Sequence, residues 1–124
     1  MSFFRVPLLG AAYYPEAWPG ELIDDDIRLM LDAGMTVARM GEFAWSSFEP
    51  KEGRIELGWL RRAVDKLAAN GIASILCTPS CTPPVWLTEK YPEVLVVKHT
   101  GVRARHGARR HACPNNPIYR GETI

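Results

Sequence analysis

The apolar residues of this chain fall into short runs that alternate with amphipathic segments. Three runs, at residues 8–14, 36–41 and 72–77, have the length of β-strands, and the first is expected to be a buried strand. Between them, two segments repeat apolar residues three or four positions apart, which is typical of a helix with one buried face. These faces consist of Ile23, Ile27, Met30 and Leu31 in the first segment and Leu60, Val64, Leu67 and Ala68 in the second.

Proline and glycine mark the expected helix ends. Pro19 suits the first position of the first helix, where a missing N–H has no cost, and Gly34 and Gly71 suit left-handed caps. The strands begin near residues 8, 36 and 72, which are 28 and then 36 residues apart. This alternation predicts an α/β fold with a parallel sheet and helical crossovers, at about the 30 residues per unit of an eightfold barrel.

The pattern weakens after the third strand. Residues 85–91 suit a short helix, 93–97 an extended segment and 98–112 irregular chain. Asn116 and Pro117 suit the cap and first position of another helix, which has hardly begun at Ile124. We therefore expect residues 1–124 to be the N-terminal portion, about three βα units, of one larger catalytic domain, with no second domain.

Composition excludes several classes of protein. The 15 Lys and Arg residues against 14 Asp and Glu give a net charge of +1, which argues against a nucleic-acid-binding arm. The 47% of hydrophobic and 23% of charged residues are ordinary for a globular protein. No apolar run approaches the ~20 residues of a membrane helix, and no secretion signal opens the chain. Three cysteines make no disulfide framework, so we expect a cytoplasmic protein without nucleic-acid or membrane partners.

Aromatic and charged residues follow each predicted strand, where α/β folds carry their functional loops. Tyr13, Tyr14 and Trp18 could form a platform for a sugar ring or a rigid turn that only packs. Arg39 and Glu42 could hold a charge for a substrate or form a structural ion pair.

Two later segments also leave alternatives open. Trp86 could line a binding cleft or lie in the core beneath a proline-stiffened loop. Residues 98–112 carry five basic residues, all three histidines and no acid, which fits a phosphate- or nucleic-acid-binding loop or a solvated loop with one functional arginine. The spacing of the cysteines does not give a closed zinc site.

Taken together, the motifs resemble one family over nearly the whole chain. The order of the motifs is its signature: Tyr13-Tyr14-Pro15-Glu16-x-Trp18-Pro19, Asp26-Ile27-Arg28-Leu29-Met30, Arg39-x-Gly41-Glu42-Phe43-Ala44-Trp45-Ser46, Glu49-Pro50-x-Glu52-Gly53, Pro83-Pro84-x-Trp86-Leu87, Lys90-Tyr91-Pro92-Glu93, and Gly107-x-Arg109-Arg110-His111-x-Cys113-Pro114-Asn115. This set is similar to glycoside hydrolase family 42, the β-galactosidases.

The resemblance implies an incomplete (β/α)8 TIM barrel and a retaining β-galactosidase that removes terminal non-reducing β-D-galactose. It implies substrate contacts for Arg109, Arg39, Glu42, Tyr14 and Trp86, with Arg109 on the galactose and Arg39 near the acidic catalytic group. It requires no cofactor. Cys113 matches the first ligand of a structural zinc cluster that some members carry, and the parent protein could be a homotrimer. Cys81 and Ala112 depart from the alanine and tyrosine usual in the family.

The resemblance also implies that the catalytic residues are missing. A retaining glycosidase needs two carboxyl groups about 5–5.5 Å apart. In the family these are glutamates at the ends of the fourth and seventh strands, and Glu16, Glu42 and Glu49 are not their equivalents. We therefore expect this stretch alone to fold poorly and to be catalytically inactive.

Three other functions compete with this interpretation. The first is a non-catalytic carbohydrate-binding module that uses Tyr13, Trp45, Trp86 and Arg109. The second is a nucleic-acid binder acting through the basic loop, and the third is a related barrel glycosidase with a different substrate.

Overall fold

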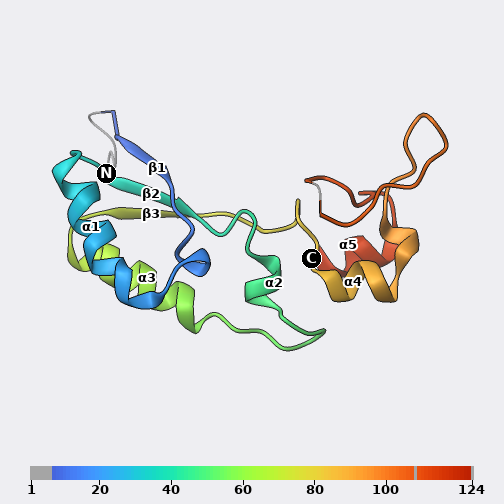
Figure 1. The fold of residues 1–124 in the computed structure, drawn as a ribbon, viewed down its shortest axis with the longest axis horizontal. Helices are drawn as coiled ribbons and strands as arrows, with labels where there is room; N and C mark the ends of the chain where they lie inside the picture. Colours follow the sequence, from blue (N-terminus) through green and yellow to red (C-terminus); the bar gives the residue numbers. More distant parts are fainter. Residues whose placement is uncertain (1–6, 108, 124) are drawn as a thin grey trace, which may run out of the picture. The chain divides into compact units, whose positions relative to one another are not determined.

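The computed structural model describes residues 7–107 and 109–123, which form two compact units (Figure 1). The first unit comprises Met1–Gly41 and Leu57–Cys77, and the second comprises Glu42–Glu56 and Thr78–Ile124. No helix within the described ranges is long and apolar enough to cross a membrane.

A parallel sheet with two helices on one face makes up the first unit (Figure 1). The strands lie in the order β1-β2-β3, and their register places Arg39 beside Ala12 on one side and Ile75 on the other. The elements, in chain order, are β1 (Gly10–Ala12), the 3-10 turns η1 (Pro15–Ala17) and η2 (Gly20–Leu22), α1 (Ile23–Asp32), β2 (Val37–Met40), α3 (Gly58–Ala69) and β3 (Ala73–Leu76).

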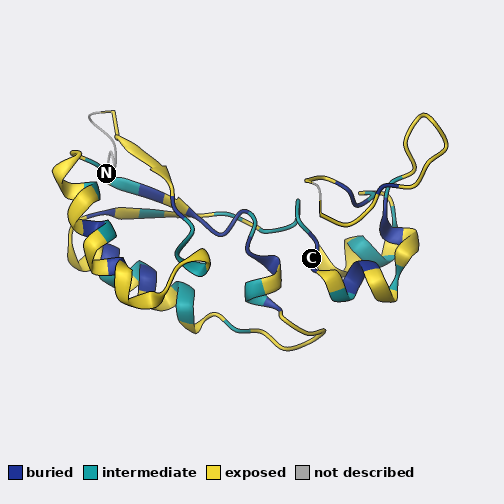
Figure 2. Cartoon of the chain, viewed as in Figure 1, coloured by how far each residue is buried: buried dark blue, intermediate teal, exposed yellow. Residues whose placement is uncertain are grey.

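The core of this unit lies between the sheet and its helices. Successive strand residues point to opposite faces, so Ala38 and Met40 are buried while Arg39 is exposed. Figure 2 shows the buried positions on the sides of α1 and α3 that face the sheet. The buried cluster consists of Tyr13, Ile23, Ile27, Ala38, Met40, Ala63, Leu67 and Ile72.

Strand order and helix placement confirm the predicted α/β fold, with local corrections. The first strand covers only Gly10–Ala12 and is exposed rather than buried, because it lies at the edge of the sheet with one neighbour. The α-helical part of the first helix begins at Ile23 rather than at Pro19, since η2 forms its entry. Leu31 and Ala68 are exposed, and Ala63 joins the core instead.

Short helices and loops make up the second unit. It contains α2 (Trp45–Phe48), α4 (Val85–Lys90), the 3-10 turn η3 (Pro92–Val94) and α5 (Pro117–Thr123). Its core consists of Trp45, Leu87, Val94 and Leu95, with Trp86, Tyr91, Ile118 and Tyr119 packed against it.

Sequence signals located two of these helices well. The helix expected at residues 85–91 is α4, and the one expected at Pro117 is α5, where the Asn116 side chain accepts a hydrogen bond from the Tyr119 N–H at 3.1 Å. The basic segment is less irregular than expected, because antiparallel bridges join Val97 to Arg103 and Leu95 to Ala112. The short helix α2 was not predicted.

Candidate functional site

Arg39 occupies the helix-free face of the sheet near the carboxyl ends of the strands. Its carbonyl accepts a hydrogen bond from the Tyr13 N–H at 2.8 Å, which extends the β1–β2 pairing by one step. A concavity of about 350 Å³ on this face is lined by residues that include Arg39, Val37 and Ile75. The fold therefore places a cation at the mouth of the sheet, where α/β proteins bind ligands.

Tyr13 points instead to the helix side of the sheet. Its hydroxyl donates a hydrogen bond to the Asp26 carboxylate at 2.8 Å, and its ring is buried. Burial raises the pKa of Tyr13 well above its usual range, and the hydrogen bond to Asp26 and the negative charges of Asp26 and Glu16 raise it further. These contacts give Tyr13 a packing role, while the neighbouring Tyr14 is half-buried at the start of η1.

Glu49 ties together the aromatic residues of the second unit. Its carboxylate accepts hydrogen bonds from the Trp45 indole N–H at 2.9 Å and from the Gly53 N–H at 2.7 Å. Its backbone carbonyl accepts the Trp86 indole N–H at 2.9 Å. Glu49 is only 8% exposed, its bond to Trp45 is buried and the other two are partly buried, and the two bonds to Trp45 and Trp86 fix both indole rings.

Arg109 lies on an aromatic support. Its guanidinium stacks on the Phe43 ring, with the central carbon 4.0 Å from the ring centre. The next residue, Arg110, has a positive φ of 55° and donates its N–H to the Cys81 carbonyl at 2.8 Å. The Cys81 thiol in turn donates to the Glu42 carbonyl at 3.0 Å. This chain of contacts holds Arg109, an exposed residue, beside Phe43.

Tyr119 connects α5 to the same loop. Its hydroxyl donates to the Ser80 carbonyl, and its ring centre lies 6.3 Å from that of Trp45. Burial is the main cause that raises the pKa of the Tyr119 hydroxyl above its usual value. The phenol therefore stays protonated and acts as a fixed donor.

The basic residues of the segment 98–112 mainly make structural contacts. Arg103 donates to the Leu95 carbonyl at 2.8 Å, which fastens the turn between the bridged strands. His106 lies 3.0 Å from the Thr88 hydroxyl and packs edge-on against His111.

The described residues do not make a complete metal site. No group of three or more His, Cys, Asp or Glu side chains that could hold a metal ion occurs at residues 7–107 and 109–123. Cys113 is half-buried and offers one thiol. A zinc ion bound there needs further ligands from outside this part of the chain.

A model of one protein family, described as beta-galactosidase of glycoside hydrolase family 42, matches residues 12–124. The chain belongs to this family. It is 50% identical over 115 residues to a beta-galactosidase of Thermus thermophilus, a match that covers 93% of this chain and 18% of the relative. It is 45% identical over 111 residues to the beta-galactosidase YesZ of Bacillus subtilis, covering 90% of this chain and 17% of the relative.

Solved structures of beta-galactosidases show the same fold. The beta-galactosidase of the Antarctic haloarchaeon Halorubrum lacusprofundi superposes with a TM-score of 0.89 at 40% identity, covering 94% of this chain and 18% of that one. The beta-galactosidase of the psychrophilic Marinomonas ef1 superposes with a TM-score of 0.88 at 38% identity, covering 94% of this chain and 18% of that one. The chain thus spans less than a fifth of these relatives. The predicted α/β fold, matching the N-terminal part of the family's barrel, is confirmed.

The predicted substrate residues fall in both units. Arg39 and Tyr14 belong to the first unit, while Arg109, Glu42 and Trp86 belong to the second. Their roles stay predictions, as does the pairing of Arg39 with Glu42.

Two contributors were not identified from the sequence. Phe43 supports Arg109, and Glu49 anchors Trp45 and Trp86. The role of Glu49 had one signal in the sequence: Trp45 and Glu49 are four residues apart, a spacing that brings side chains together on a helix.

Proposed function

We propose that the protein carrying this sequence is a retaining β-galactosidase that removes terminal non-reducing β-D-galactose from β-D-galactosides. The observation that carries the proposal is the family 42 match over residues 12–124. Relatives of 40–50% identity bear the name beta-galactosidase, and the chain spans 16–18% of their length. Residues 1–124 would contribute sugar contacts, with the reacting carboxylates elsewhere in the protein.

We propose Arg109 as the residue that binds the galactose ring. A planar guanidinium with five donors suits the vicinal hydroxyls of a pyranose, and stacking on Phe43 reduces the rotamer entropy lost on binding. The hydrogen bonds from Arg110 to Cys81 and from Cys81 to Glu42 support the same position. Trp86, held by the Glu49 carbonyl, offers an apolar wall for the C–H face of a sugar.

Glu49 is a poor candidate for either catalytic carboxylate. One of its oxygens accepts a hydrogen bond from Trp45 and the other accepts one from Gly53, which leaves little room for proton transfer or attack. A retaining mechanism needs a pair about 5–5.5 Å apart. We propose that this pair comes from glutamates beyond Ile124.

The test is hydrolysis of a chromogenic β-galactoside by the whole protein, with the configuration of the released galactose followed by proton NMR. The β-anomer should appear first, because two successive displacements retain configuration. Residues 1–124 alone should show no turnover. First appearance of the α-anomer, or robust turnover by residues 1–124, contradicts the proposal.

Substitution of Arg109 tests its role within that activity. Arg109→Ala removes hydrogen bonds to a charged donor, worth about 1.5–3 kcal/mol, so kcat/KM should fall about 10- to 150-fold. Arg105→Ala, an exposed arginine of the same segment, is the matched control and should change kcat/KM less than about twofold. Equal effects of the two substitutions would remove Arg109 from the sugar site.

Three further properties belong to the proposal. The protein would be cytoplasmic and could assemble as a homotrimer. Cys113 could contribute to a structural zinc site, which metal analysis of the purified whole protein tests directly.

A further inference from the structure

We infer that the cavity between the η1–η2 segment and α3 binds a single neutral pyranose ring. The cavity has a volume of about 300 Å³ and lies wholly within the first unit. Small-molecule sites range from about 300 to 1,000 Å³, so it has room for one sugar ring rather than an oligosaccharide. Its lining does not include Arg109 or Trp86, the two residues proposed above for galactose binding, and the inference therefore goes beyond the proposed function.

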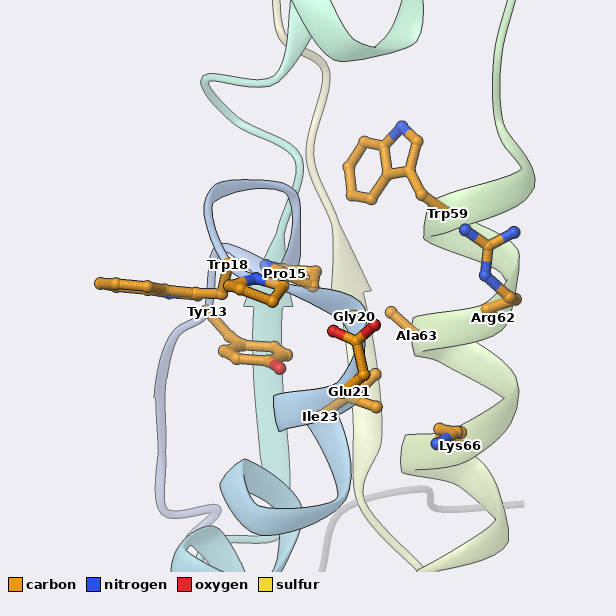
Figure 3. Close-up of a pocket in the computed structure, with 11 residues that line it drawn as sticks. Tyr13, Pro15, Trp18, Gly20, Glu21, Ile23, Trp59, Arg62, Ala63 and Lys66 are labelled. Atoms are coloured by element: carbon orange, nitrogen blue, oxygen red, sulfur yellow. The ribbon is translucent and has the colours of Figure 1, made fainter.

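Aromatic and apolar side chains from two elements form its walls. Figure 3 shows the Trp59 ring reaching from the first turn of α3 over the gap, with the Pro15 ring across from it. Trp18 also lines the cavity and is 60% exposed, a large exposure for an indole. Indole and proline rings offer flat apolar surface to the C–H face of a pyranose, and an indole N–H can also reach a hydroxyl.

Polar groups of both charges complete the cavity. Glu21 and Arg62 both line the cavity, Glu21 from η2 and Arg62 from α3, and Figure 3 shows the Glu21 carboxylate on the side of the gap that faces Ala63. A carboxylate accepts and a guanidinium donates, so together they can bind neighbouring hydroxyls, which do both. Such a donor–acceptor pair beside an aromatic wall is the arrangement that a polyhydroxylated ring needs.

The charge balance favours a neutral ligand over an anion. Lys66 also lines the cavity, but its ammonium lies 2.7 Å from both oxygens of Asp24. Asp24 thus neutralises the charge of Lys66. The remaining charges of the cavity lining, positive on Arg62 and negative on Glu21, cancel each other. A phosphorylated or carboxylated sugar would bring a charge that the cavity does not compensate.

Fluorine NMR of the whole protein labelled with 5-fluorotryptophan tests the inference. The lines of Trp18, Trp59, Trp45 and Trp86 are assigned by Trp→Phe variants, and methyl β-D-galactopyranoside is titrated in the Arg109→Ala background. The Trp59 line should shift with methyl β-D-galactopyranoside until the site is saturated. Galactose 6-phosphate should bind no more tightly than this neutral sugar. Because binding is scored at Trp59, the result does not depend on whether the protein hydrolyses galactosides.

Exposed residues provide variants with little risk to folding. Glu21→Gln and Arg62→Gln should each weaken the titration at Trp59 at least about fivefold, the effect of one lost hydrogen bond. The matched controls are Asp25→Asn and Arg61→Gln, whose partners Arg28 and Asp65 lie outside the cavity, and these should leave the titration unchanged. A Trp59 line that does not shift, a shift that both cavity variants leave intact, or tighter binding of the phosphorylated sugar overturns the inference.

Discussion

Glu49→Gln tests whether one buried carboxylate organises the aromatic residues of the second unit. The native carboxylate accepts from both the Trp45 indole N–H and the Gly53 N–H. A glutamine has one acceptor oxygen and an NH2 group, so one of these two donors must face another donor. The protein then loses one hydrogen bond to a charged acceptor.

The magnitude follows from these two bonds. A hydrogen bond to a charged group contributes about 1.5–3 kcal/mol, so the local opening free energy at Gly53 should fall by about 2 kcal/mol. This corresponds to amide exchange about 30-fold faster around residue 53. Hydrogen–deuterium exchange with mass spectrometry measures this local opening around residue 53 in the whole protein.

Glu52→Gln is the matched control from the same loop. Glu52 pairs with Lys90, and both side chains are more than 40% exposed, so solvent screening leaves this pair little effect on stability. Exchange around residue 53 should change less than about fivefold in this variant. If Glu49→Gln exchanges as slowly as the native protein, or if both variants accelerate exchange equally, Glu49 does not have the role assigned to it.

Two further predictions concern single hydrogen bonds. Tyr13→Phe removes the bond to Asp26 and should cost about 1 kcal/mol at neutral pH. Because the folded state raises the pKa of Tyr13 above its unfolded value of about 10, its contribution is complete below pH 10 and is lost as the pH rises further. The difference between native and Tyr13→Phe proteins in thermal unfolding should therefore shrink above pH 10, and a constant difference contradicts this. Asn116→Ala removes the cap of α5 and should accelerate exchange of the Tyr119 amide about fivefold, a loss of about 1 kcal/mol, whereas the exposed neighbour Asn115→Ala should not.

Local signals in the sequence predicted most of the first unit. Helical periodicity located α1 and α3, and the caps at Gly34 and Gly71 have the expected positive φ of 73° and 75°. The apolar composition of β1 suggested a buried strand, and its exposure was not predictable from that composition. Burial of a strand depends on what lies beside it and over it, whereas composition shows only that the strand tolerates an apolar environment.

The candidate site was harder to predict because its contacts join distant parts of the chain. Trp86 bonds to Glu49 across 37 positions, and Cys81 bonds to Glu42 across 39. No local pattern encodes such pairs. The motifs therefore named residues such as Arg109 as candidates without revealing that Phe43 supports it.

The location of the catalytic nucleophile tests the central claim most directly. A retaining β-galactosidase treated with an activated 2-deoxy-2-fluorogalactoside accumulates a covalent glycosyl–enzyme ester, which peptide mapping assigns to one carboxylate. We predict that the whole protein is labelled on a glutamate outside residues 1–124. A label on Glu16, Glu42 or Glu49 would contradict the account.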